Sequence, residues 1–115
     1  MAISEAYSGS ETVSTTEWSL TTDTAGPDAD ATDGVYQVFL DVSALADGDA
    51  FELRGYEKVL SGSTQRVIFI DTIQNAQVEP VYVTPSLILV HGWDFTLLKV
   101  AGTARNIDWS IRKIA

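Results

Sequence analysis

Apolar and polar residues alternate with a period of two along several stretches of this chain. The clearest case is near the end, where Ile107, Trp109 and Ile111 are separated by polar residues. Residues 35–42 show a similar pattern, with Tyr36, Val38, Leu40 and Val42 on one side. A strand with this pattern buries one face and exposes the other to water, as in an antiparallel sheet with one solvated side. These stretches predict β-strands.

The whole chain reads as a series of short strands separated by turns. The predicted strands are residues 18–20, 35–42, 51–60, 65–72, 80–83, 87–90, 95–100 and 107–114. Turn signals recur about every 8 to 12 residues, and no helical period of 3.6 persists. This pattern predicts an all-β antiparallel sandwich, jelly-roll-like or Ig-like, with seven or eight strands. A barrel stays open, because strand number alone does not separate the two.

Strand pairing can be proposed from order along the chain. Consecutive strands are usually neighbours, so residues 35–42 are expected to pair with 51–60. The stretches 95–100 and 107–114 are expected to form a closing hairpin.

The first seventeen residues differ from the remainder in composition. They are rich in Ser, Thr, Glu and Gly and contain few apolar positions. Such a segment buries too little apolar surface to offset chain entropy unless another surface covers it. We therefore expect residues 1–17 to form an extended arm or an edge strand, and residues 18–115 to form a single domain. One hypothesis is that the arm becomes ordered only against a neighbouring chain, so that its deletion leaves the melting temperature nearly unchanged.

Three stretches carry apolar residues on both sides of a predicted strand: 67–70, 87–90 and 95–98. A monomeric sandwich needs a polar outer face on each sheet. Either loops and the N-terminal arm cover these strands, or they contact another chain, since exposed apolar patches usually mark interaction sites. The candidate contact residues are Ile68, Ile70, Ile88, Val90, Trp93 and Phe95.

Charge is unevenly distributed. The net charge is 7 minus 16, or −9, and residues 1–53 contain eleven acids and no Lys or Arg. Nucleic-acid binding is not expected, because it depends on Lys and Arg that neutralise phosphates. Residues 54–115 contain seven bases and five acids, so the two parts of the chain have net charges of −11 and +2. This opposite charge could guide self-association, or the acids could simply keep the protein soluble. No wholly apolar run exceeds five residues, so we expect no membrane span, and the first residues lack the features of a secretory signal.

Candidate chemistry is sparse. The chain has no cysteine and one histidine, His91. Ser86, His91 and Asp94 are the residue types of a catalytic triad, but a triad is defined by geometry, and no nucleophile-elbow motif is present. Asp28 and Asp33 bound an acidic loop that could attract Ca²⁺, although its spacing fails the EF-hand pattern. We therefore predict no catalytic residue, no metal site and no cofactor.

Aromatic residues offer one alternative. Trp93, in a Gly-Trp-Asp turn, could form part of the flat platform of a carbohydrate-binding module, whereas Trp109 belongs to an alternating strand and is expected in the core. Exposed aromatic residues are also common anchors of protein interfaces.

Several segments taken together resemble small virion structural proteins of tailed bacteriophages, of the head decoration or cement type. The segments are residues 7–11, 33–39, 63–67, 86–94 and 109–113. The resemblance implies a β-rich, non-enzymatic protein that binds the outer surface of a capsid and stabilises it. Its expected partners are the major capsid protein and further copies of itself, with a trimer as the first guess. Its expected location is the virion surface, after assembly in the host cytoplasm. A neck, tail or fibre role is an alternative.

Overall fold

The computed structural model describes residues 2–114. Within that range it contains ten strands and no helix. The strands are β1 (Ile3–Val13), β2 (Trp18–Ser19), β3 (Thr24–Ala25), β4 (Gly34–Asp41), β5 (Ala50–Glu57), β6 (Arg66–Gln74), β7 (Val81–Val83), β8 (Leu87–Leu89), β9 (Asp94–Ala101) and β10 (Arg105–Ile114). The predicted number of seven or eight is lower than this, because the sequence pattern gave no sign of the two-residue strand β3 and the count left out β1, which was expected as an extended arm or an edge strand.

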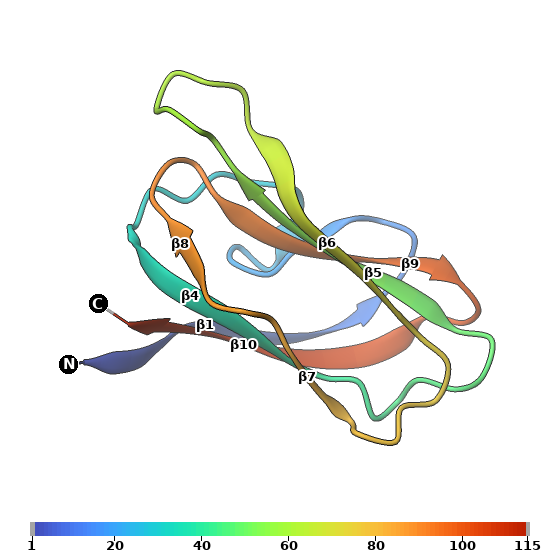
Figure 1. Cartoon of the computed structure of the whole chain (residues 1–115). Helices are drawn as coiled ribbons and strands as arrows, with labels where there is room; N and C mark the ends of the chain where they lie inside the picture. The colour runs from blue at the N-terminus through green and yellow to red at the C-terminus, as the bar shows by residue number, and fades with distance from the viewer. Residues whose placement is uncertain (1, 115) are drawn as a thin grey trace.

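The strands form two five-stranded antiparallel sheets that pack as a sandwich (Figure 1). In the first sheet the order is β1–β10–β4, with β7 and β8 both paired to the far edge of β4. In the second sheet the order is β3–β2–β9–β5–β6. The predicted all-β antiparallel sandwich is confirmed. In the part of the chain that is described, no helix is long and apolar enough to cross a membrane.

The core lies between the two inner faces and follows the predicted alternation. Tyr36, Val38 and Leu40 on β4 are fully buried. On the neighbouring β10, Ile107 and Ile111 are fully buried and Trp109 is 3% exposed. The period of two therefore identified the inner faces of both strands.

Both sequence-based pairings are wrong. The strands β4 and β5 follow one another in the chain but lie in different sheets: β4 pairs with β10, β7 and β8, and β5 pairs with β6 and β9. The strands β9 and β10 are likewise split between the two sheets and form no hairpin. In each case the connecting turn crosses from one sheet to the other, as in a sandwich that closes a core between consecutive strands.

The N-terminal segment is an edge strand rather than a free arm. The strand β1 pairs with β10 from Ile3 opposite Ile114 to Val13 opposite Arg105, so the two ends of the chain lie side by side (Figure 1). Val13 is 1% exposed and belongs to the core. The hypothesis that residues 1–17 become ordered only against a neighbour is therefore wrong, because this chain already provides the pairing surface.

Candidate functional site

Trp93 and Phe95 lie in the core and are not available as surface contacts. Both are fully buried. The Trp93 ring packs at 4.3 Å from the ring of Tyr36 and 5.9 Å from that of Phe95, and its Nε1 donates a hydrogen bond to the carbonyl of Thr32 at 2.9 Å. The expectation that they contact a partner is therefore wrong, and Trp93 cannot serve as a carbohydrate platform in this conformation.

Trp93 is buried because a loop that is distant from it in the sequence covers it. Backbone hydrogen bonds of 2.8 Å run in both directions between Asp30 and Trp93, so residues 27–33 cover the Gly-Trp-Asp turn. Phe95 points inward opposite Gly55, where a Cβ would approach the Phe95 ring to 3.2 Å.

The other four candidate contact residues are exposed. The exposed fractions are 46% for Ile68, 58% for Ile70, 84% for Ile88 and 41% for Val90. They do not all lie on one strand or in one sheet, because Ile68 and Ile70 belong to β6 and Ile88 belongs to β8. Their exposure is confirmed, whereas contact with another chain remains a prediction.

The three triad-type residues do not form a triad. The Asp94 carboxylate accepts hydrogen bonds of 2.8 Å from Thr21 Oγ1 and from the backbone N–H groups of Asp28 and Phe95. Burial raises the pKa of Asp94, although these hydrogen bonds oppose the shift. Within residues 2–114, no hydrogen bond joins the side chains of Ser86, His91 and Asp94 to one another. Asp94 therefore holds both ends of the segment 21–28, which contains β3.

The acidic loop is likewise held by internal hydrogen bonds. The Asp28 carboxylate accepts a hydrogen bond from Thr22 Oγ1 at 2.8 Å. The Asp30 carboxylate accepts one from the Tyr7 hydroxyl and one from the Thr32 N–H at 2.8 Å. Burial and the Asp30 carboxylate raise the pKa of Tyr7 to about 12. In the described part of the chain, no three His, Cys, Asp or Glu side chains are placed to hold a metal ion.

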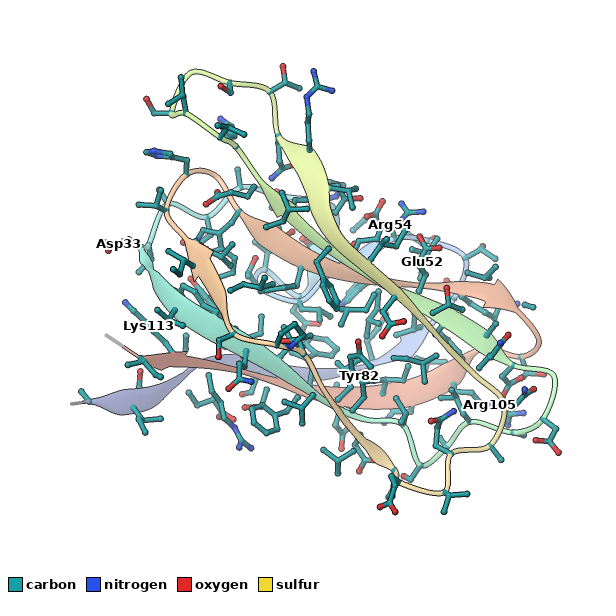
Figure 2. All side chains as sticks on the ribbon, in the orientation of Figure 1. Asp33, Glu52, Arg54, Tyr82, Arg105 and Lys113 are labelled. Atoms are coloured by element: carbon teal, nitrogen blue, oxygen red, sulfur yellow. The ribbon has the colours of Figure 1, made fainter. Side chains whose placement is uncertain are left out.

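A polar network on the outer face of the second sheet was not anticipated from the sequence. The Glu17 carboxylate accepts hydrogen bonds from Thr96 Oγ1 at 2.6 Å and from the Tyr56 hydroxyl, and it lies 3.3 Å from Arg54 Nη1. Arg54 also pairs with Glu52, beside it on the same strand (Figure 2). Arg54 and Tyr56 are 37 and 39 positions from Glu17, so no local pattern could reveal the network. Through Glu17 the network links the segment just before β2 to β5 and β9. Both carboxylates, Glu17 and Glu52, already have hydrogen-bond donors in this network.

The outer face of the first sheet carries two shallow grooves that meet at one stacked pair. The guanidinium carbon of Arg112 lies 3.8 Å from the centre of the Phe39 ring, and both residues line both grooves, of about 200 and 230 Å³. At one end of this face, four aliphatic side chains form a row across four paired strands: Ile3, Ile114, Val35 and Ile88. A row of this kind is unusual on a surface that faces water, because it leaves apolar area unburied.

Exposed apolar side chains gather in one part of the chain. Among residues 2–114, twelve large apolar side chains are exposed, and ten of them lie between positions 59 and 90. That segment contains only three charged residues, Arg66, Asp71 and Glu79, whereas the whole chain contains 7 plus 16, or 23. The ten are Val59, Leu60, Val67, Ile68, Ile70, Val78, Val81, Val83, Ile88 and Val90.

All twelve of these side chains are aliphatic. None of the aromatic side chains in residues 2–114 is exposed to the same degree, and Trp93 and Trp109 are in the core. Over residues 2–114, the exposed apolar surface that a binding partner could contact is therefore aliphatic and contains no flat, exposed aromatic ring.

Comparisons with known proteins add little to this geometry. No family model and no curated protein matches the chain. One solved structure described as a xylan-binding domain from CBM 22 is similar, with 18% sequence identity and a TM-score of 0.42. The match covers 86% of this chain and 64% of that structure, so the chain spans less than two thirds of its length.

Proposed function

We propose that this protein is a non-enzymatic docking module that binds a protein surface, and that this surface is the outside of a phage capsid, which it decorates and stabilises. The observation that carries the proposal is the gathering of exposed aliphatic side chains between residues 59 and 90. Burial of a fully exposed side chain of this kind is favourable by about 1.5–3 kcal/mol. The ten side chains are 41% to 93% exposed, so each contributes part of this range, and a partner that covers several of them gains their sum.

The composition of this segment fits a protein partner better than a glycan. The buried centre of a protein interface is depleted of charged residues, as residues 59–90 are. Sugar rings are usually held by exposed aromatic faces and hydrogen-bonding groups, whereas the exposed side chains here are Val, Leu and Ile. Trp93, the one aromatic residue expected to face a glycan, is buried.

The positions of the chemically capable residues support a role without catalysis. Glu17, Asp94 and Glu57 all accept hydrogen bonds from groups in distant segments, which commits them to holding loops and strands. A general acid or base must instead reach a substrate proton.

The resemblance of segments such as residues 63–67 and 86–94 to phage decoration proteins supplies the kind of partner, namely the major capsid protein. Self-association, with a trimer as the first guess, is part of the same proposal. The absence of cysteine suits assembly in a reducing host cytoplasm before the protein reaches the virion surface.

The test uses capsids of the phage whose genome encodes the sequence, prepared without this protein. Purified protein is added, and the bound fraction is measured by co-sedimentation and located by cryo-electron microscopy. We expect saturable binding at a fixed site on the shell and an increase in the temperature at which the shell disassembles. Absence of binding, or density confined to the neck, tail or fibres, would reject the capsid role.

A further inference from the structure

We infer that the tip of the β5–β6 hairpin is the anchor of the docking surface, and that Val59 and Leu60 insert into an apolar pocket of the shell protein with carboxylates at its rim. This inference rests on the proposed function and identifies the part of the molecule that performs it.

The tip extends away from the body of the sandwich. Residues 58–65 connect β5 to β6 and project beyond the ends of the neighbouring strands (Figure 1). Val59 is 83% exposed and Leu60 is 66% exposed. The sequence pattern placed both residues at the end of a strand, but β5 ends at Glu57, so they lie in the loop.

The tip turn is internally hydrogen-bonded. The N–H of Ser63 donates to the carbonyl of Leu60 at 2.9 Å, and the N–H of Leu60 donates to Ser63 Oγ at 3.3 Å. The turn therefore has a defined conformation that presents its two aliphatic side chains to solvent.

The base of the hairpin is fixed to the segment that follows β8. The Glu57 carboxylate accepts hydrogen bonds from the N–H groups of Val90 at 2.7 Å and His91 at 3.0 Å. On the other side of the hairpin, the Gln65 amide donates to the carbonyls of Asp28 at 2.7 Å and Gly92 at 2.8 Å. A loop already held in one conformation loses little entropy on binding, which increases the affinity that a few side chains can provide.

Hollows flank the hairpin on two sides. One, of about 530 Å³, is lined by Val59, Val67 and Ile68, and another, of about 260 Å³, is lined by Val90 and His91. We call the five exposed aliphatic residues around the tip the hairpin surface: Val59, Leu60, Val67, Ile68 and Val90. It contains two of the four exposed residues that the sequence identified as candidate contacts, Ile68 and Val90.

The charges beside the hairpin surface indicate the chemistry of the partner. Lys58 and Arg66 flank the tip, and neither forms an ion pair within residues 2–114. Carboxylates around the partner's pocket would complement these two cations. The alternative of an anionic lipid surface is disfavoured, because the protein as a whole carries a net charge of −9.

The test compares two double variants that each replace two exposed aliphatic side chains by serine. Val59→Ser with Leu60→Ser removes the two aliphatic side chains at the tip, and Ile3→Ser with Val100→Ser is the control, since Ile3 and Val100 are 71% and 55% exposed and lie outside residues 59–90. We expect the tip variant to bind shells at least about tenfold more weakly, and the control to bind as wild type. Neither variant should change the melting temperature or the solution mass, because these side chains are exposed.

A charge variant tests the rim. Lys58→Glu with Arg66→Glu should weaken shell binding and reduce its dependence on salt. Equal binding by the tip variant and wild type would overturn the inference while leaving the proposed function intact. Failure of wild type to bind shells would overturn both. Binding of wild type to vesicles of phosphatidylcholine and phosphatidylserine, or a change of solution mass in the tip variant, would assign the tip to a membrane or to self-association and so reject the inference.

Discussion

Gly9 on β1 lies directly opposite Trp109 on β10, and the indole ring of Trp109 fills the space where a side chain at position 9 would stand. A Cβ built on Gly9 would overlap the six-membered ring. The Trp109 Nε1 donates a hydrogen bond to the carbonyl of Leu20 at 2.9 Å, which limits how far the ring can move. The edge strand β1 can therefore pack on Trp109 only because position 9 is a glycine, which has no side chain.

We predict that Gly9→Ala destabilises the protein by about 1–3 kcal/mol, the usual range for overpacking. Replacing Gly by Ala in a strand is otherwise favourable, so the sign of the effect reports the contact with Trp109. Chemical denaturation would measure it, with Ser8→Ala as the control on the exposed side of the same strand. A neutral or stabilising Gly9→Ala would mean that β1 does not pack on Trp109.

We also predict that deleting residues 2–13 abolishes cooperative unfolding. The deletion removes all of β1, leaves one edge of β10 unpaired, and takes away Val13 and the Tyr7 ring, which packs 6.2 Å from the ring of Trp93. Near-ultraviolet circular dichroism during a thermal melt would show whether fixed tertiary packing persists. A sharp transition near the wild-type temperature would contradict this prediction and would mean that the remaining strands fold cooperatively without β1.

The sequence suggested an extended arm or an edge strand at residues 1–17, and the structure shows the edge strand, for a physical reason. Residues 1–17 contain few apolar positions, and composition alone reads such a segment as uncovered chain. The backbone of β1 is nevertheless satisfied by β10, which lies about a hundred positions away, as in the pair Ser8 and Ser110. Main-chain pairing of this kind leaves no mark in the side-chain pattern of the strand that receives it.

The alternation of apolar and polar residues could be read from the sequence because it is a local pattern. The pairing partners of each strand could not be read from it, because they are distant in the chain. The period of two in β4 and β10 identified the buried residues Val38 and Ile111. The burial of Trp93 depends on Asp30, and the anchoring of Glu17 depends on Arg54, contacts made by segments that meet only in the folded chain. Exposed apolar strands were also predictable, since residues 67–70 and 87–90 contain more apolar positions than one inner face can bury.

Asp49 should make the protein sensitive to acid. Its carboxylate accepts hydrogen bonds from the N–H groups of Thr103 at 3.0 Å and Ala46 at 2.9 Å and from Arg105 Nε at 2.7 Å. These bonds, with the Thr103 N–H as the largest cause, lower the pKa of Asp49 to about 2. Because the folded pKa lies below the unfolded one, the stability that Asp49 contributes is present above about pH 4 and is lost as pH falls toward 2.

The corresponding variant is Asp49→Asn. We expect it to be less stable than wild type at pH 7, with a difference that shrinks as the pH is lowered from 4 to 2. Urea unfolding at a series of pH values measures this. Asp33→Asn removes the same charge from an exposed position and controls for the change in net charge (Figure 2). A difference that stays constant from pH 7 to pH 2 would contradict the role of these hydrogen bonds.

Asp94 should show the opposite dependence on pH. It is fully buried, and burial raises its pKa, so the folded pKa lies above the unfolded one. The contribution of a group shifted in this direction is greatest below the unfolded pKa and is lost as pH rises through the folded pKa. Although burial disfavours the ionised form of Asp94, its carboxylate accepts hydrogen bonds from Thr21, Asp28 and Phe95. Removing the carboxylate would leave these donors without an acceptor, which is destabilising.

We therefore predict that Asp94→Asn destabilises the protein by about 1–3 kcal/mol, because an amide has one oxygen and cannot accept on both sides. The difference from wild type should be larger near pH 4 than near pH 7, in contrast to Asp49→Asn. Hydrogen exchange at the Asp28 amide, which donates to Asp94 Oδ2 at 2.8 Å, should be faster in the variant. If that amide exchanged at the wild-type rate, the segment 21–28 would be held by other contacts, and Asp94 would not be its anchor.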